Sequence, residues 1–213
     1  MVPFIDIHTH KNTSLPNEIY IKNIFPGSEF PNNPFSIGLH PWYAKETDTK
    51  NLIETLEMAV QNPYCYTIGE IGLDKVCDTP YSIQQSVFEL QVQFAQKAGK
   101  PVIIHNVKST QEILNIIKGK TIPFIFHGFT GNYQTMKQIL DKGGYISFGK
   151  SLMQHKPTIE SLTKVPQNSF FLETDESCFT IDEIYLKARA LLNIDISELK
   201  NNIYSNYKNI FNK

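Results

Sequence analysis

Short apolar runs alternate with longer stretches of helical periodicity along this chain. Eight runs rich in Ile, Val, Phe and Tyr predict strands that are buried on both faces. They cover residues 4–8, 19–25, 35–39, 66–71, 101–105, 124–128, 145–149 and 170–174. Apolar residues at helical spacing predict helices over 49–62, 82–99, 109–119, 132–143, 156–164, 180–192 and 195–211. Residues 109–112 and 195–198 have the pattern of helix starts, and Gly99 is a stop signal.

A strand followed by a helix, repeated along the chain, predicts a parallel sheet. Eight strand candidates in 213 residues favour a trimmed or distorted (β/α)8 TIM-type barrel, formed by a single domain over 1–213. It is trimmed because the first two connections are too short for full helices. An open doubly wound sheet is the alternative, but no glycine-rich phosphate loop follows an early strand.

Composition indicates the compartment of the protein more clearly than its activity. The formal net charge is −1, from 20 basic and 21 acidic residues, so charge argues neither for nor against nucleic acid. Arg189 is the one arginine. Three cysteines without a CxxC pair suit a reducing compartment. The chain has no secretory signal pattern and no apolar run long enough to cross a bilayer, which predicts a soluble cytoplasmic protein without a membrane partner.

Polar residues interrupt the apolar runs near the ends of the predicted strands. In FIDIHTH, strand alternation places Asp6, His8 and His10 on one face and the two isoleucines on the other. Later strand candidates carry four further candidates, and His40 follows the third strand. The set predicted to bind metal is His8, His10, Glu70, His105, His127 and Asp175. A barrel collects such residues at the C-terminal ends of its strands.

Burying this many ionisable groups without partners would cost several kcal/mol each, and a pair of divalent cations removes that cost. Imidazole and carboxylate ligands without thiolate suit Zn, Mn, Fe or Co, and Mg less well. We expect two divalent ions (Zn, Mn or Mg), with Glu70 as the bridging carboxylate. Such a centre activates water for hydrolysis, and Asp175 is the candidate that holds or deprotonates that water.

The motifs FIDIHTH, IGLHP, TIGEIGLD, PVIIH, FIFHGFTG and FLETD, in this order, resemble the TatD-like family of metal-dependent hydrolases within the amidohydrolase-like group. The resemblance covers about residues 4 to 176, and GEIGLD and LETD are its most specific parts. It implies a distorted (β/α)8 barrel and a metal-dependent deoxyribonuclease activity. It further implies His8, His10 and Asp175 at one metal, His105 and His127 at the other, and Glu70 between them.

The chain departs from the family pattern around the substrate. Where the family often has an arginine after the fifth-strand histidine, this chain has Val107 and then Lys108. A lysine attracts phosphate but cannot make the planar two-pronged contact of arginine. The resemblance implies DNA as the substrate, with His40 and Lys108 as substrate-binding candidates, and this departure favours the alternatives. The alternatives are a small ester, lactone, amide or phosphoester, or a barrel that binds a ligand without catalysis.

Four residues near these motifs leave more than one interpretation open. Trp42 and Tyr43 are candidates either for packing at the barrel rim or for stacking on a ring or base. His155 is expected on the surface, and Cys178 is expected to be a bystander thiol. The sequence indicates no obligate protein partner.

Overall fold

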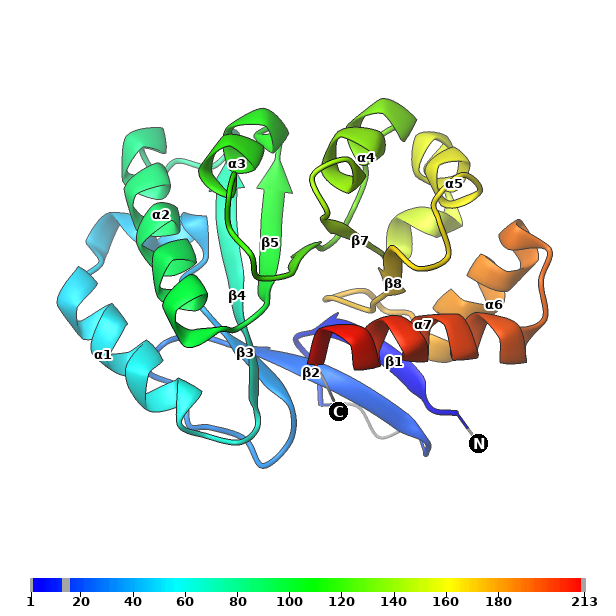
Figure 1. Cartoon of the computed structure of the whole chain (residues 1–213), viewed down its shortest axis with the longest axis horizontal. Coiled ribbons are helices and arrows are strands. Elements are labelled where there is room, and N and C mark those ends of the chain that lie inside the picture. The colour runs from blue at the N-terminus through cyan, green and yellow to red at the C-terminus, as the bar shows by residue number, and fades with distance from the viewer. Residues whose placement is uncertain (1, 13–15, 212–213) are drawn as a thin grey trace. The chain divides into compact units, whose positions relative to one another are not determined.

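The computed structural model describes residues 2–12 and 16–211, and its elements are labelled in Figure 1. The strands are β1 (Phe4–Thr9), β2 (Glu18–Ile24), β3 (Phe35–Ile37), β4 (Cys65–Asp74), β5 (Val102–Val107), β6 (Phe124–Phe126), β7 (Tyr145–Phe148) and β8 (Phe170–Leu172). The α-helices are α1 (Thr49–Val60), α2 (Tyr81–Ala98), α3 (Thr110–Ile116), α4 (Tyr133–Leu140), α5 (Lys156–Leu162), α6 (Ile181–Leu192) and α7 (Ile196–Phe211).

The strands follow one another in the order β1 to β8, which confirms the predicted (β/α)8 fold class. Every predicted strand and helix is present, with bounds that differ by a few residues. No helix occurs among the described residues between β1 and β2 or between β2 and β3, as the short connections predicted. Within residues 2–12 and 16–211, none of the helices has the length and apolar character that crossing a membrane requires.

The chain divides into two compact units, and the division falls inside β2 and inside β6. Unit 1 consists of Met1–Ile21 and Phe126–Lys213, and unit 2 consists of Lys22–Ile125. The single-domain organisation stays a prediction. Each unit is described by itself below.

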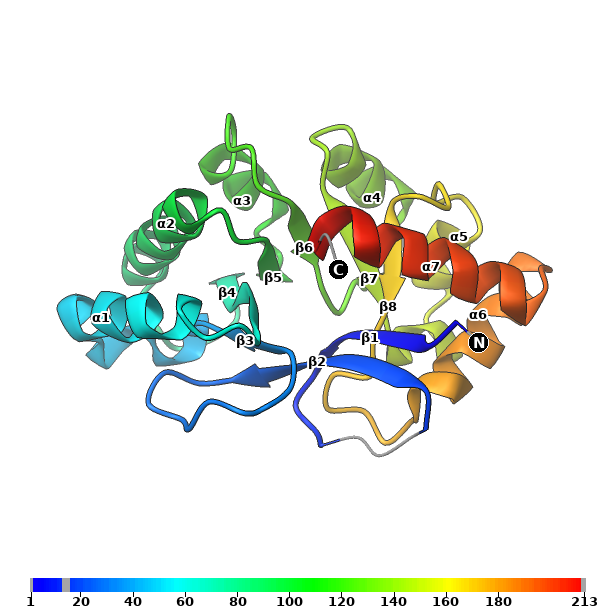
Figure 2. The ribbon, with the colours of Figure 1, turned by 60° about the horizontal axis from the view of Figure 1, so that its bottom comes forward.

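In unit 1, β7 pairs with β8 in parallel, and Thr9 at the end of β1 forms a parallel bridge with Asp175 beyond β8. Helices α6 and α7 pack against β1, which Figures 1 and 2 show beside them. The Tyr185 hydroxyl on α6 bonds both backbone groups of Ile5, accepting from its N–H at 3.0 Å and donating to its carbonyl oxygen at 3.2 Å. Ile5 and Ile7 are fully buried, so β1 is anchored on its apolar face, and its other face carries Asp6 and His8.

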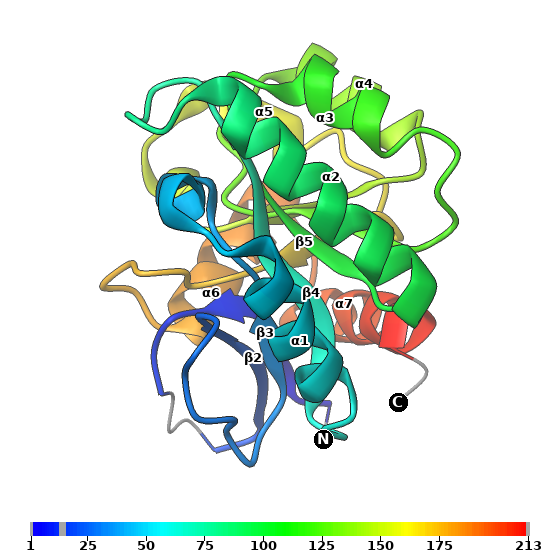
Figure 3. The same cartoon turned by 90° about the vertical axis from the view of Figure 1, so that its left-hand side faces the viewer.

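In unit 2, β2, β3, β4 and β5 pair in parallel. Figure 3 shows α2 lying along β4, next to α1. Helix α2 ends at Gly99, whose φ of +63° is the left-handed conformation that stops a helix. Strand β4 extends to Asp74, three residues beyond the predicted end, because its pairing with β5 continues to Asp74 opposite Val107.

Two short helices lie outside the predictions, whereas both predicted helix starts are present. Two short 3-10 helices, η1 (Pro41–Glu46) and η2 (Lys150–Met153), were not predicted, because segments this short lack a readable period. Helix α3 begins at Thr110 with Ser109 as its N-cap residue, as predicted, although the Ser109 hydroxyl donates to the Val107 carbonyl oxygen and not to the helix. At the other predicted helix start, Asp195 accepts a hydrogen bond from the Ser197 N–H at 2.7 Å.

Candidate metal centre

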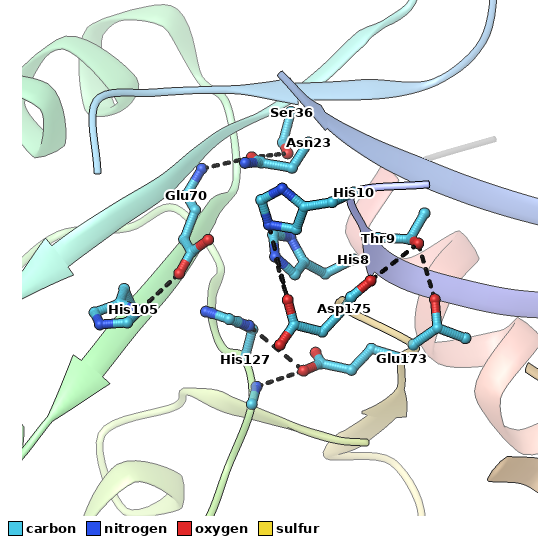
Figure 4. A network of polar contacts seen from close by, with 12 residues as sticks. His8, Thr9, His10, Asn23, Ser36, Glu70, His105, His127, Glu173 and Asp175 are labelled. Atoms are coloured by element: carbon cyan, nitrogen blue, oxygen red, sulfur yellow. Dashed lines mark hydrogen bonds and ion pairs between the residues drawn. The ribbon is translucent and has the colours of Figure 1, made fainter. Parts of the chain in front are cut away.

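Unit 1 brings His8 of β1 and His10, just beyond the end of β1, together with a carboxylate from beyond β8 (Figure 4). His8 Nε2 lies 3.9 Å and His10 Nε2 lies 3.8 Å from Asp175 Oδ1. The His8 side chain is fully buried, whereas those of His10 and Asp175 are 20% and 24% exposed. The set is therefore buried on the His8 side and partly exposed on the side of His10 and Asp175.

The Asp175 backbone holds this carboxylate on β1. Its N–H donates to the His8 carbonyl oxygen at 3.0 Å, and its own carbonyl oxygen accepts from the His10 N–H at 3.4 Å. The residue adopts a φ of +52°, in the left-handed region that aspartate tolerates better than most residues. A strained conformation of this kind costs about 1–3 kcal/mol and persists where surrounding contacts impose it.

A buried hydrogen-bond network of Asp6, Thr9 and Thr174 supports this set of ligands. Asp6 Oδ1 accepts from the Thr174 N–H at 3.0 Å, and its Oδ2 accepts from the Thr174 hydroxyl at 2.6 Å. The Thr174 hydroxyl also lies 2.8 Å from Thr9 Oγ1. Burial raises the pKa of the Asp6 carboxyl well above its ordinary value, although the bonds from Thr174 oppose this. Asp6 therefore ties β1 to the segment that carries Asp175.

His127 directly follows β6, and its ring lies 4.3 Å from the ring of His8, measured between centroids. Glu173, which is fully buried, approaches His127 Nδ1 to 3.4 Å and accepts from the Gly128 N–H at 2.6 Å through the same oxygen, Oε1 (Figure 4). Glu173 thus fixes both the histidine and the backbone after it.

Glu173 contacts the candidate ligand His127, although sequence reasoning assigned it no role. Its other carboxylate oxygen, Oε2, has no hydrogen-bond partner among the described residues. A signal existed in LETD, because Glu173 is a second carboxylate two residues before the predicted ligand Asp175.

Unit 2 brings together Glu70 from β4, His105 from β5 and His40, which precedes η1. His105 Nδ1 lies 2.6 Å from Glu70 Oε1, and His40 Nε2 lies 3.3 Å from the same oxygen (Figure 4 shows the first contact). Glu70 stands in the middle of β4 rather than near its end, because β4 is longer than predicted. The Glu70 N–H donates to Asn23 Oδ1 at 2.8 Å, and Asn23 Oδ1 also accepts from the Ser36 hydroxyl.

Asp74 is the second residue without a predicted role, although it ends the GEIGLD motif. Its Oδ2 lies 3.2 Å from His105 Nε2 and accepts from Trp42 Nε1 at 2.8 Å. Burial raises the pKa of the Asp74 carboxyl, but the hydrogen bonds from Trp42, the Val76 N–H and His105 together hold it below its ordinary value. The His105 ring is therefore held between two carboxylates.

The remaining candidates lie at the surface. Lys108 is exposed just beyond β5 with a φ of +54°. Trp42 and Tyr43 are 55% and 56% exposed, so neither is buried in rim packing. His155 is exposed and belongs to neither donor set, and its Nδ1 lies 2.8 Å from the Thr158 hydroxyl. Cys178 is an exposed free thiol.

These donor sets fit divalent cations. In unit 1 the separations of 3.8 and 3.9 Å are too long for hydrogen bonds. They are the separations expected when the two ligand atoms of a pair bind the same cation, each at about 2.0–2.2 Å. In unit 2 the ligand atoms of His40, Glu70 and His105 lie within 4.8 Å of one another. Because carboxylates engage both ring nitrogens of His105, a cation at this set would replace the His105–Glu70 hydrogen bond.

Of the six predicted ligands, the structure places four in unit 1 and two in unit 2. His8, His10 and Asp175 form one group, and His127 lies against His8. Glu70 and His105 form the other group, and His40, predicted to bind substrate, joins them as a third potential ligand.

Residues 12–212 match the family described as TatD related DNase. An uncharacterized metal-dependent hydrolase from Haemophilus influenzae is 32% identical over 160 residues, which cover 68% of this chain and 60% of that protein. The human 3'-5' RNA nuclease TATDN2 is 31% identical over 157 residues, which cover 68% of this chain and 20% of that protein.

The fold has solved counterparts as well. The crystal structure of YjjV, a TatD homolog from Escherichia coli, superimposes with a TM-score of 0.83 at 21% identity, covering 99% of this chain and 98% of that one. The likeness in fold therefore spans almost the whole chain, whereas the sequence matches span less than two thirds of either relative's length. The chain belongs to the TatD related DNase family of metal-dependent hydrolases.

Proposed function

We propose that this protein is a metal-dependent phosphodiesterase that hydrolyses nucleic acid strands. The observation that carries the proposal is that each unit gathers two imidazoles and one carboxylate within 4.8 Å, in an arrangement that fits a divalent cation. In a (β/α)8 fold the functional residues of all strands serve one site at the C-terminal ends of the strands. Each donor set would hold a divalent cation of its own.

The metal ligands in this proposal are His8, His10, Asp175, Glu70, His105 and His127. Bound divalent cations supply the Lewis acidity that polarises a phosphoryl oxygen and makes water nucleophilic at neutral pH. The chain's own residues supply placement and a proton acceptor.

Asp175 is the proposed acceptor, because its partly exposed carboxylate is locked onto β1 beside two imidazoles. The water oxygen forms a bond to phosphorus while its proton passes to Asp175. The bond from phosphorus to the leaving oxygen breaks, and that oxygen takes a proton from solvent. His40 contacts Glu70 and holds its carboxylate in place. Lys108 attracts a phosphate of the strand through its single positive charge.

The names of related proteins favour nucleic acid as the substrate class. The family is described as TatD related DNase, and the human relative is named a 3'-5' RNA nuclease. Both names concern phosphodiester bonds. A small ester or phosphoester remains the second candidate, because Val107 and Lys108 replace the arginine that would clamp a phosphate in two places.

The test is hydrolysis of single-stranded DNA and RNA oligonucleotides of one sequence, beside a panel of small esters, lactones and phosphodiesters. We expect strand cleavage that chelation removes and added divalent metal restores. His105→Ala should abolish cleavage with the fold retained, and His155→Ala, an exposed histidine outside both donor sets, is the matched control. Full activity of His105→Ala, or turnover confined to the small compounds, would overturn the proposal.

Metal content is a separate check on the ligand assignment. Elemental analysis of the purified protein should give about two equivalents of divalent metal per chain, and Asp175→Asn and His105→Ala should each lower that content. Stoichiometry unchanged in both variants would contradict the proposed ligands.

A further inference from the structure

Trp42 is the one tryptophan of the chain, and it is held firmly while its ring stays exposed. Its Nε1 donates to Asp74 Oδ2 at 2.8 Å, its carbonyl oxygen accepts from the Thr79 hydroxyl at 2.9 Å, and its N–H donates to His40 Nδ1 at 3.3 Å. Even so, 55% of its surface is exposed. Ordering a side chain this large costs conformational entropy that burial normally offsets. An indole that is held in place and yet exposed to solvent is therefore suited to bind a ligand.

A cavity of about 310 Å³ adjoins this ring. It is lined by Trp42, Asp74, Val76, Cys77, Asp78 and Thr79. Its volume lies at the lower end of the ~300–1,000 Å³ typical of ligand pockets, which suits a single ring system with its sugar. The described lining residues include two carboxylates and no basic side chain, so the cavity repels a phosphate and admits a neutral group.

The ring also adjoins the donor set of unit 2. The centroid of Trp42 lies 4.9 Å from that of His40 and 6.4 Å from that of His105, with interplanar angles of 88° and 77°. A flat group on the indole would therefore lie within one nucleotide's reach of Glu70 and His105. The contact with the indole involves a single flat group and does not depend on the length of the strand.

We propose that Trp42 is the stacking platform for one unpaired base of the strand that is cleaved, with the base seated in the cavity between Trp42 and Thr79. This inference rests on the proposed function, since it places the base beside the scissile phosphodiester. The acidic lining excludes the phosphate from the cavity and leaves it to the metal ligands. Stacking accepts every base, because each has a π-face.

The first experiment measures binding without catalysis. Because Trp42 is the only tryptophan, fluorescence excited at the long-wavelength edge, where tyrosine does not absorb, reports on this ring alone. Titration with 2′-deoxyadenosine should quench it saturably, and deoxyribose 5-phosphate, which has no base, should not. Tyr43→Ala is the matched control, since Tyr43 is 56% exposed beside Trp42 but does not line the cavity, and it should keep the quenching.

The second experiment measures cleavage of single-stranded DNA and RNA of the same sequence, to identify which strand supplies the base. Trp42→Ala should raise KM about 5- to 150-fold on the cleaved strand, the factor that corresponds to one base–aromatic stack, with kcat nearly unchanged. Trp42→Phe keeps a ring but loses the bond to Asp74, and should retain most of the affinity. On an oligonucleotide that is abasic at the terminal nucleotide, Trp42→Ala and the native protein should be equal.

The outcomes separate this inference from the proposed function. Quenching by deoxyadenosine without strand cleavage would support the subsite and contradict the nuclease activity. Cleavage without quenching, with Trp42→Ala no worse than Tyr43→Ala, would overturn the subsite alone. If Trp42→Phe lost as much as Trp42→Ala, mainly in kcat, Trp42 would act by positioning Asp74 and His105, and the stacking role would fail.

Discussion

Replacing Gly72 by alanine should destabilise the protein strongly, because the backbone of β5 occupies the space of the added methyl group. Gly72 lies opposite His105 in the β4–β5 pairing. A Cβ at this position would stand 1.9 Å from the His105 carbonyl oxygen, whereas real Cβ atoms keep at least 3.0 Å from their neighbours. The obstacle is backbone, so no side-chain rotation relieves it, and β5 must move by about 1 Å.

The magnitude follows from that displacement. Overpacking costs about 1–3 kcal/mol. A 1 Å movement also stretches ladder hydrogen bonds past the ~3.2 Å limit, and two such bonds are worth about 0.5–1.5 kcal/mol each. We expect a loss of about 2–6 kcal/mol in the free energy of unfolding. At 2–4 °C per kcal/mol for a chain of this size, a value of about 4 kcal/mol lowers Tm by about 8–16 °C.

Urea and thermal unfolding followed by circular dichroism measure this loss, and Gly99→Ala is the control. Gly99 has a left-handed φ of +63°, but a Cβ there meets nothing within 4 Å, so the substitution adds only backbone strain of about 1–2 kcal/mol. Gly72→Ala should therefore be clearly the less stable variant. If the two variants were equally stable, the close approach of β4 and β5 would not be the reason for the glycine at position 72 in GEIGLD.

Three further predictions concern single side chains. Glu173→Gln removes the charge beside His127 and should weaken metal binding about 10- to 100-fold in a metal-buffered titration, while Glu176→Gln, exposed nearby, should leave it unchanged. Asp175→Asn, which tolerates the same left-handed φ, should retain the fold by circular dichroism and lose activity by a factor of about 10²–10⁴; activity near the native level would remove Asp175 as proton acceptor. Burial raises the pKa of the Cys65 thiol to about 11, so at pH 8 an aromatic disulfide reagent should label exposed Cys178 quickly and Cys65 only after unfolding. Rapid labelling of Cys65 in the folded protein would contradict its burial.

The secondary structure could be predicted because its signals are local. The stripe over 82–99 indicated α2, and a left-handed glycine ends that helix at Gly99. The runs of Ile, Val and Phe indicated strands, since strands of a parallel sheet are buried on both faces. The end of β4 was missed because it depends on the pairing of Asp74 with Val107, which are far apart in sequence.

The candidate site could be predicted as a list of residue types but not as a set of contacts. Repeated histidines and carboxylates near strand ends named six metal-ligand candidates, whereas His40, a potential ligand in unit 2, was expected to bind substrate. Glu173 and Asp74 went unassigned although both stand in recognised motifs. Their importance lies in bonds to His127 and His105, and the sequence separation of these pairs hides it. The same holds for Trp42, whose exposure and anchoring to Asp74 are visible only in three dimensions.

By itself, the sequence determined the order of strands and helices, the fold class and the kind of metal chemistry, because each follows from local periodicity or from residue types within short motifs. Only the tertiary structure decided which atoms meet. It placed His127 against His8, His105 between two carboxylates, and the Asp175 backbone on β1. Such contacts join residues that are distant along the chain, and their geometry is set by the packing and register of whole strands, which no local pattern encodes.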